Sequence, residues 1–250
     1  MVENTSTAVN VATAQDSSFG PAKRLELKPP FASICTGTAM VAAAAAAAYF
    51  AVAWMTRVAP ESFSAGRAWA AGALLFLACS VVQYRVFLTL FPLITGRILN
   101  GSAAEFRYCV YMLYTIFIFH WVHSDLIPFP FKIGLYRMLG ARFGTGLKGG
   151  AIILDPPMTR IGDDVVLGYQ SVLIGHSADG STFTLAPVEI GNNVLIGARA
   201  VIMPGVVIGD GAIVASNAVV LQGAVVGPRE VWGGVPAKFI KMKRLEQTPQ

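Results

Sequence analysis

The chain has 250 residues, enough for one or two domains. Only 13% of its residues are charged and 54% are hydrophobic, a composition that departs from soluble globular domains and predicts membrane segments. The formal net charge of +5 forms no basic stripe with interleaved aromatic residues, so nucleic acid is not an expected partner.

The first 30 residues are rich in Ser, Thr, Asn, Ala and Gln and end in "PAKRLELKPP". Such a segment buries too little apolar surface to offset the entropy of ordering, so residues 1–30 are predicted to be a disordered cytosolic tail. It does not resemble a secretory signal, because the apolar run comes late and is long.

Residues 31–131 are predicted to form a membrane-anchoring helical region. Residues 31–56 contain no charge and residues 68–94 contain only Arg85, and both runs exceed the roughly 20 residues that a spanning helix needs. The third apolar segment, residues 108–131, contains an aspartate and two prolines, so a re-entrant or interfacial helix and a full span both remain open.

Lysines and arginines flank both ends of this region. The positive-inside rule then places both flanks in the cytoplasm, which requires an even number of crossings, and we favour two. His120 and His123 share one helical face in the third segment. They are interpreted either as polar anchors at the membrane surface or as the lining of a channel for a lipid acceptor or a hydrogen-bond site.

Residues 132–244 carry a repeat of six residues, as in "IGDDVVLGYQSV" and "IGNNVLIGARAVIMPGVVIGDGAIV". A period of six fits neither a helix nor a hairpin sheet, but a short strand and a tight corner form a solenoid, with three units in each triangular coil. The residues leading each unit are predicted to stack as its core: Ile161, Leu167, Leu173, Ile190, Ile196, Ile202, Ile208, Val214, Val220, Val226 and Trp232. Residues 245–250 are left as a tail.

The order of "LYRMLGARFGTGL", "IGDDVVLGYQSVLIGH", "VEIGNNVLIGARAVIMPGVVIGDGAIV" and "GGVPAKFIK" resembles the hexapeptide-repeat acyltransferases, most closely the branch of maltose and galactoside O-acetyltransferases. The resemblance covers roughly residues 135–244. It implies a left-handed parallel β-helix that assembles as a homotrimer. It also implies transfer of an acyl group from acetyl-CoA without a metal.

The repeat is interrupted between Leu173 and Ile190 by the excursion "SADGSTFTLAPVE", and His176 stands at the point of departure. A rigid stack beside a loop suits a general base, although a histidine that only caps a corner would look the same. In the family that the chain resembles, the catalytic histidine occupies this position, so His176 is the predicted base.

The resemblance also implies a donor site between subunits, in which corner residues meet the pantetheine arm and C-terminal lysines meet the phosphates. The residues so implied are Gly197, Ala198, Ser216, Lys238 and Lys241. The two lysines are equally explained as ordinary surface residues. A Thr-Lys pair common in relatives is replaced by Leu221-Gln222, which puts the phosphate contacts in doubt.

Together these features predict a membrane-anchored acyltransferase of the bacterial inner membrane, multi-pass, with a cytoplasmic catalytic domain. Its acceptor would be a hydroxyl or amine of a sugar, a glycan precursor or a lipid-linked molecule, and membrane lipids are expected partners. The alternative is a non-catalytic trimeric β-helix scaffold at the membrane. A metal-dependent β-helix enzyme of the carbonic anhydrase kind needs three histidines at each metal, and the repeat contains only His176.

Overall fold

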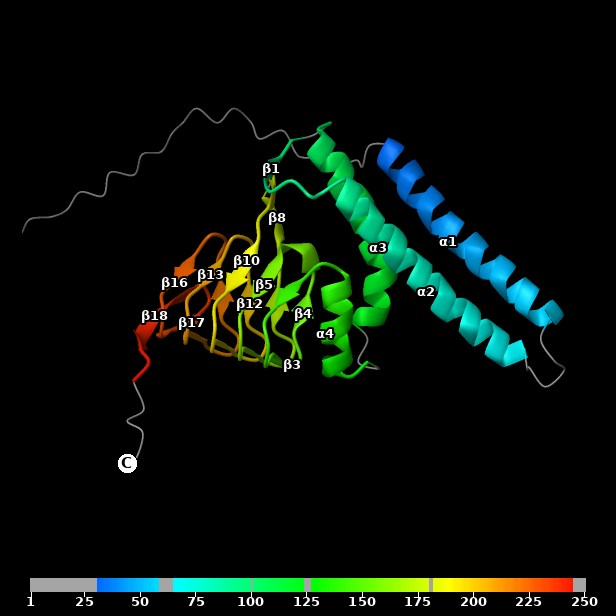
Figure 1. Cartoon of the computed structure of the whole chain (residues 1–250). Helices are drawn as coiled ribbons and strands as arrows, with labels where there is room; N and C mark the ends of the chain where they lie inside the picture. The colour runs from blue at the N-terminus through cyan, green and yellow to red at the C-terminus, as the bar shows by residue number, and fades with distance from the viewer. Residues whose placement is uncertain (1–30, 59–64, 100, 124–126, 180–181, 245–250) are drawn as a thin grey trace, which may run out of the picture.

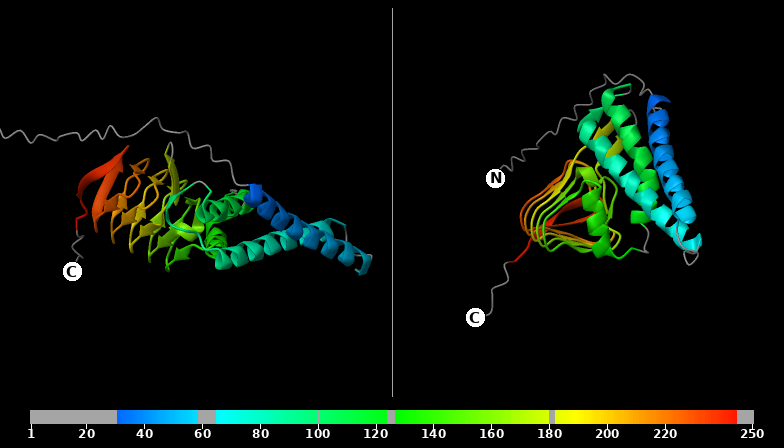
Figure 2. Two further views of the ribbon diagram at one scale, coloured as in Figure 1. Left: turned by 90° about the horizontal axis from the view of Figure 1, so that it is seen from above. Right: turned by 45° about the vertical axis from the view of Figure 1, so that its right-hand side comes forward.

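The computed structural model describes residues 31–58, 65–99, 101–123, 127–179 and 182–244. The predicted tails, residues 1–30 and 245–250, lie outside the described residues. Figure 1 shows a bundle of helices at one end of a coiled stack of short strands, and the view from above in Figure 2 shows the first two helices extending away from that stack.

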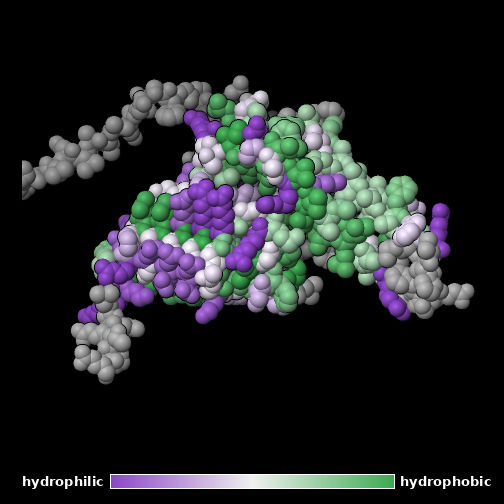
Figure 3. All heavy atoms as spheres, in the orientation of Figure 1, coloured by the Kyte–Doolittle hydropathy of each residue, from purple (hydrophilic) through white to green (hydrophobic). Residues whose placement is uncertain are grey.

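Helices α1 (Phe31–Val58) and α2 (Ala65–Leu90) form an antiparallel pair. Each contains a stretch long and apolar enough to cross a membrane, Cys35–Trp54 and Ala70–Leu90. The surface of this pair is predominantly hydrophobic (Figure 3). Helix α2 ends four residues before the predicted end of its span at residue 94, because Pro92 follows and proline disfavours helical conformation in the residue before it.

Helix α3 (Ala103–Val122) packs against α1 and α2 and against the start of the strand stack. It is not among the candidate spans in the described part of the chain. Helix α4 (Phe129–Met138) begins at a proline N-cap with a second proline in its first turn, where a missing N–H costs nothing. The helix therefore runs across the predicted domain boundary between residues 131 and 132, and the strand stack begins only after it.

The strand stack is a parallel β-helix with three faces, as the six-residue repeat predicts. Face 1 consists of β2 (Arg142–Phe143), β5 (Thr159–Ile161), β10 (Val188–Ile190), β13 (Val207–Ile208) and β16 (Val225–Val226). Face 2 consists of β3 (Lys148–Gly149), β6 (Val166–Leu167), β11 (Leu195–Ile196), β14 (Ile213–Val214) and β17 (Glu230–Gly234), with β18 (Ala237–Met242) added antiparallel at its end. Face 3 consists of β4 (Ile152–Ile153), β7 (Val172–Leu173), β12 (Val201–Ile202) and β15 (Val219–Val220).

The core of the solenoid is the column of predicted leading residues. Along face 3, for example, Leu173 is paired in register with Ile202, and Ile202 with Val220, and all three are completely buried. Trp232 alone among the predicted leaders is only half-buried, because it lies in the last coil and has no coil beyond it. Each coil therefore depends on its neighbours for burial, as expected for a solenoid.

The interruption of the repeat is a β-hairpin, β8 (His176–Asp179) and β9 (Thr182–Leu185), which leaves the corner between faces 3 and 1. Its outer partner is β1 (Gly96–Ile98), a short strand from the segment between α2 and α3, which pairs antiparallel with β9. The sequence predicts only a covering loop here. The excursion is instead held in a three-stranded sheet that joins the helical region to the solenoid.

Candidate active site

His176 lies beside Asp155 at the corner between faces 3 and 1. The parallel register places Ile153 of β4 next to Leu173 of β7, so the residues that follow these two strands lie one above the other. The two side chains meet directly, with His176 Nδ1 2.6 Å from Asp155 Oδ2. A histidine and a carboxylate from successive coils thus form a pair.

Asp155 is buried, and donors surround its carboxylate. Its side chain is 1% exposed, against 26% for His176. Besides the histidine, the backbone N–H of Gly175 donates to Oδ2 at 2.8 Å and the Tyr111 hydroxyl donates to Oδ1 at 3.2 Å. These donors replace the water that a buried carboxylate loses.

The pair determines which ring nitrogen of His176 can act as a base. An ionised carboxylate only accepts hydrogen bonds, so the nitrogen facing it, Nδ1, carries the proton. In the neutral ring Nε2 is then left with its lone pair. Such a nitrogen can take a proton from a bound hydroxyl or amine.

Two aromatic rings surround the imidazole of His176. The Phe183 ring of β9 is stacked nearly parallel to it, at a centroid distance of 6.0 Å, and the Tyr108 ring of α3 lies at the same distance. Tyr108 and Phe183 are 4.5 Å apart, and both are buried. Burial and then the negative charge of Asp155 raise the pKa of the Tyr108 phenol, so it keeps its proton at neutral pH.

The predicted pantetheine-binding residues lie at a different corner of the solenoid, between faces 2 and 3. Gly197 and Ala198 follow β11, and Ser216 follows β14 in the next coil. A Cβ at Gly197 would lie 2.3 Å from the backbone nitrogen of Ser216, so close stacking alone requires glycine there. Within one chain the structure does not bring these residues together with His176.

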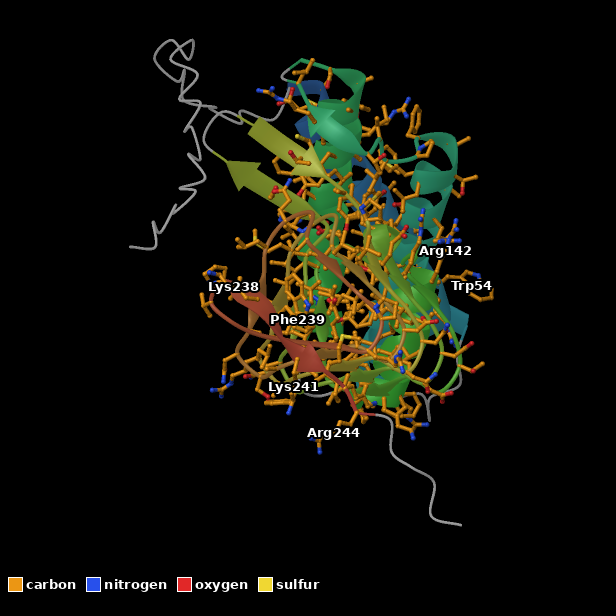
Figure 4. The ribbon with its side chains drawn as sticks, turned by 90° about the vertical axis from the view of Figure 1, so that its left-hand side faces the viewer. Trp54, Arg142, Lys238, Phe239, Lys241 and Arg244 are labelled. Carbon is orange, nitrogen blue, oxygen red and sulfur yellow. The ribbon has the colours of Figure 1, made fainter. Side chains whose placement is uncertain are left out.

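Lys238 and Lys241 lie on β18, at the end of the solenoid opposite the helices, and both are exposed (Figure 4). Gln222 lies at the corner of His176, and its side-chain oxygen accepts a hydrogen bond of 2.7 Å from the Ser177 hydroxyl. This contact ties the hairpin to a later coil.

Within the described ranges, no group of three or more His, Cys, Asp or Glu side chains is arranged to hold a metal ion. The cysteines Cys35, Cys79 and Cys109 all lie on helices α1 to α3. The solenoid has no cysteine in its sequence, so an acyl-thiol relay has no nucleophile there.

His123 is directed toward the solenoid, where its Nε2 lies 3.3 Å from the carbonyl oxygen of Ile153. Its ring lies 6.3 Å from that of Tyr136 on α4. The contact supports the predicted hydrogen-bond site over an anchor at the membrane surface. The side chain of His120 lies outside the described residues.

Burial lowers the pKa of His123, which predicts a loss of stability in mild acid. Below about pH 6.5 the unfolded chain binds a proton that the folded chain resists, so stability falls as the pH drops from there toward the lowered folded pKa. His123→Gln can still donate to Ile153 but does not titrate. We expect its melting temperature to fall less than that of the wild type between pH 7 and pH 5, and parallel curves would contradict this.

Sequence reasoning missed Asp155 and Tyr111. Asp155 could have been found by aligning successive coils of the repeat. The stretch "ILDPP" places a carboxylate two residues after Ile153, at the corner below His176. The distance in sequence between Tyr111 and Asp155 is 44 residues, and they belong to different parts of the fold. No local pattern in the sequence signals that contact.

Part of the chain matches a known family model. Residues 187–222 match the family model described as bacterial transferase hexapeptide (six repeats). No curated protein matches the chain. A hexapeptide-repeat acetyltransferase from Vibrio cholerae, solved with acetyl coenzyme A, is similar over 60% of this chain and 94% of its own, at 22% identity and a TM-score of 0.44.

Two further solved structures are similar. A maltose O-acetyltransferase from Clostridium difficile has 18% identity over 68% of this chain and 89% of its own, with a TM-score of 0.37. A galactoside acetyltransferase solved with coenzyme A has 17% identity over 67% of this chain and 82% of its own, with a TM-score of 0.36. The fold and the family-model match define the class as a parallel β-helix of hexapeptide repeats, here with a His–Asp pair at one corner.

Proposed function

We propose that this chain is an acyltransferase that moves an acetyl or similar acyl group from coenzyme A to a hydroxyl or amine, with His176 as general base. The observation that carries the proposal is the contact of 2.6 Å between His176 Nδ1 and the buried Asp155, at the corner where the hexapeptide repeat is interrupted. The family-model match and the acetyltransferases with similar folds support the same reaction class.

The chemistry needs one proton carrier. His176 Nε2 accepts the proton of the acceptor's O–H or N–H as its oxygen or nitrogen attacks the thioester carbonyl carbon. The tetrahedral intermediate then expels the coenzyme A thiolate, which takes the proton from Nε2. Asp155 stabilises the imidazolium between these steps, and general-base help of this kind contributes roughly 10²–10⁴ in rate.

The donor site would form between copies in a homotrimer, because His176 and the glycine-rich corner of Gly197 lie on different edges of one chain. Outward-facing aliphatic residues on faces 1 and 2 support such packing. Val166, Leu195, Val207 and Val225 are between 37% and 65% exposed. Pantetheine would then lie along Gly197, Ala198 and Ser216 of a neighbouring copy. Lys238 and Lys241 would supply charge for the phosphates.

The helices α1 and α2 would anchor the enzyme in the inner membrane, with the solenoid in the cytoplasm. Four large apolar side chains on this pair are at least 66% exposed: Tyr49, Phe50, Trp54 and Leu74. Exposure of such side chains is unfavourable in water and favourable in lipid. An antiparallel pair returns the chain to the side where it entered. Such an enzyme would reach a lipid-linked sugar or another membrane-bound acceptor.

The test is thioester cleavage by the full-length protein in detergent. Release of free coenzyme A thiol from acetyl-CoA, stimulated by a lipid extract and less by soluble sugars, is the expected result. Stimulation by soluble sugars alone would retain the reaction and refute the lipid-linked acceptor. If no acyl-CoA is cleaved and coenzyme A does not bind, the scaffold alternative replaces the enzyme.

Asp155→Asn tests the pair separately from the base. An amide can donate to Nδ1, which places the ring proton on Nε2 and leaves no lone pair facing the acceptor. We expect kcat to fall about 10²-fold with the KM for acetyl-CoA unchanged. Asp210→Asn, at another corner, should retain wild-type kcat. Equal kcat values for both variants and the wild type would exclude a role for Asp155.

A further inference from the structure

Helix α3 contacts the His–Asp pair through the side chain of Tyr111. This tyrosine is completely buried, and its hydroxyl donates to Asp155 Oδ1 at 3.2 Å, with the Leu154 carbonyl oxygen also near at 3.3 Å. His176 and Gly175 occupy the other carboxylate oxygen, Oδ2. The two oxygens of Asp155 are thus held from opposite sides, one by the solenoid and one by α3.

The chemistry of Tyr111 suits a permanent donor. Burial and then the negative charge of Asp155 raise the pKa of its phenol well above the ordinary value, so it stays protonated across the physiological range. A protonated hydroxyl facing a carboxylate can only donate to it, and hydrogen bonds to charged groups are the stronger kind.

Neighbouring side chains hold the ring of Tyr111 in place. Its ring lies 5.8 Å from Tyr108 and 6.1 Å from Tyr84 of α2, and Tyr84 donates a hydrogen bond of 2.9 Å to the Leu139 carbonyl oxygen after α4. Strand β1 fixes the hairpin of His176 from the same helical region. Helices and solenoid therefore meet at the His–Asp pair.

We propose that Tyr111 is a positioning residue that fixes the orientation of Asp155, and that helix α3 thereby completes the active site and does not merely attach it to a membrane. This inference rests on the proposed function of His176 as the base. The physical reason is that a carboxylate held at both oxygens cannot rotate. The Nδ1–H of His176 therefore always donates to the same oxygen, and Nε2 always points in the same direction.

The experiment is a double-mutant cycle in the full-length protein with acetyl-CoA as donor. Tyr111→Phe keeps the ring and removes only the hydroxyl, and we expect kcat to fall about tenfold with the KM for acetyl-CoA unchanged. In the Asp155→Asn background the same change should alter kcat less than twofold, because the group it orients is gone. Losses that multiply in the double variant would overturn the proposal.

Tyr114→Phe is the matched control. Tyr114 is also buried on α3, but its hydroxyl lies 3.3 Å from Gln83 Oε1 and does not reach Asp155. It should retain wild-type kcat while showing how much the loss of a buried tyrosine hydroxyl lowers the melting temperature. Equal losses of kcat in Tyr111→Phe and Tyr114→Phe would mean that the effect is structural, and the positioning role would be rejected.

A second measurement does not depend on turnover. In protein labelled with ¹⁵N-histidine, His176 should show the Nδ1–H tautomer in the wild type and in Tyr114→Phe, and a mixture of tautomers in Tyr111→Phe. An unchanged tautomer in Tyr111→Phe refutes the inference even if acyl transfer is confirmed. If the wild type cleaves no thioester, the proposed function fails, and this spectrum alone decides whether Tyr111 orients the pair.

Discussion

His176→Ala is expected to lower kcat/KM for acyl transfer about 10²- to 10⁴-fold, the range that general-base catalysis supplies. His176 is the one histidine of the described solenoid, residues 142–244, and its Nδ1 contacts the buried carboxylate of Asp155. Residual turnover should persist, because positioning of donor and acceptor contributes separately. The measurement is release of coenzyme A thiol with saturating acetyl-CoA and a varied acceptor.

The alanine change also removes one of the donors to Asp155, so a second substitution separates catalysis from stability. His176→Asn can still donate an amide N–H to the carboxylate but cannot accept a proton. It should be as inactive as His176→Ala and melt closer to the wild type. His123→Gln serves as the histidine control and should retain activity. Substantial turnover by His176→Asn would remove the general base from the proposal.

The solenoid could be predicted in detail because the contacts that bury its core follow directly from the spacing of residues along the chain. Each leading residue, such as Ile196 or Ile202, is buried by the residues six positions away in sequence and by its counterparts one coil away, so the period alone predicts a solenoid with three units in each coil. The interruption at His176 was visible for the same reason. The β-hairpin that forms the interruption could not be predicted. It pairs with Gly96–Ile98, a strand of only three residues without any repeating pattern.

The candidate site was predicted only in part. His176 stands out from the repeat, but its partners come from other layers: Asp155 from the coil below and Tyr111 from a helix that composition assigns to the membrane region. Apolar composition indicates burial and does not distinguish lipid from protein as the burying medium. Helix α3 is such a case, since Tyr108 and Tyr111 pack on the solenoid.

Gly149→Ala is expected to destabilise the first coil strongly. Gly149 has a φ of +122°, and an added Cβ would lie 1.7 Å from the carbonyl oxygen of Leu167 in the coil above. That oxygen also accepts the N–H of Gly150, so it cannot move away without losing a hydrogen bond between coils. We expect a loss of about 3 kcal/mol, which lowers the melting temperature by roughly 6–12 °C.

Gly223→Ala measures the cost of a left-handed φ at a corner that has room for the added Cβ. Gly223 has a φ of +69° with no atom within 4 Å of an added Cβ, and Asn193, Arg199 and Asn217 adopt a similar left-handed φ at other corners. Its cost should be about 1 kcal/mol. The difference between the two variants therefore contains the contact between coils, on which the position of Asp155 below His176 depends, together with the greater strain of an alanine at the φ of +122° of Gly149. Equal melting temperatures for the two would mean that the first coil does not pack on the second, and that the His–Asp pair is not assembled as described.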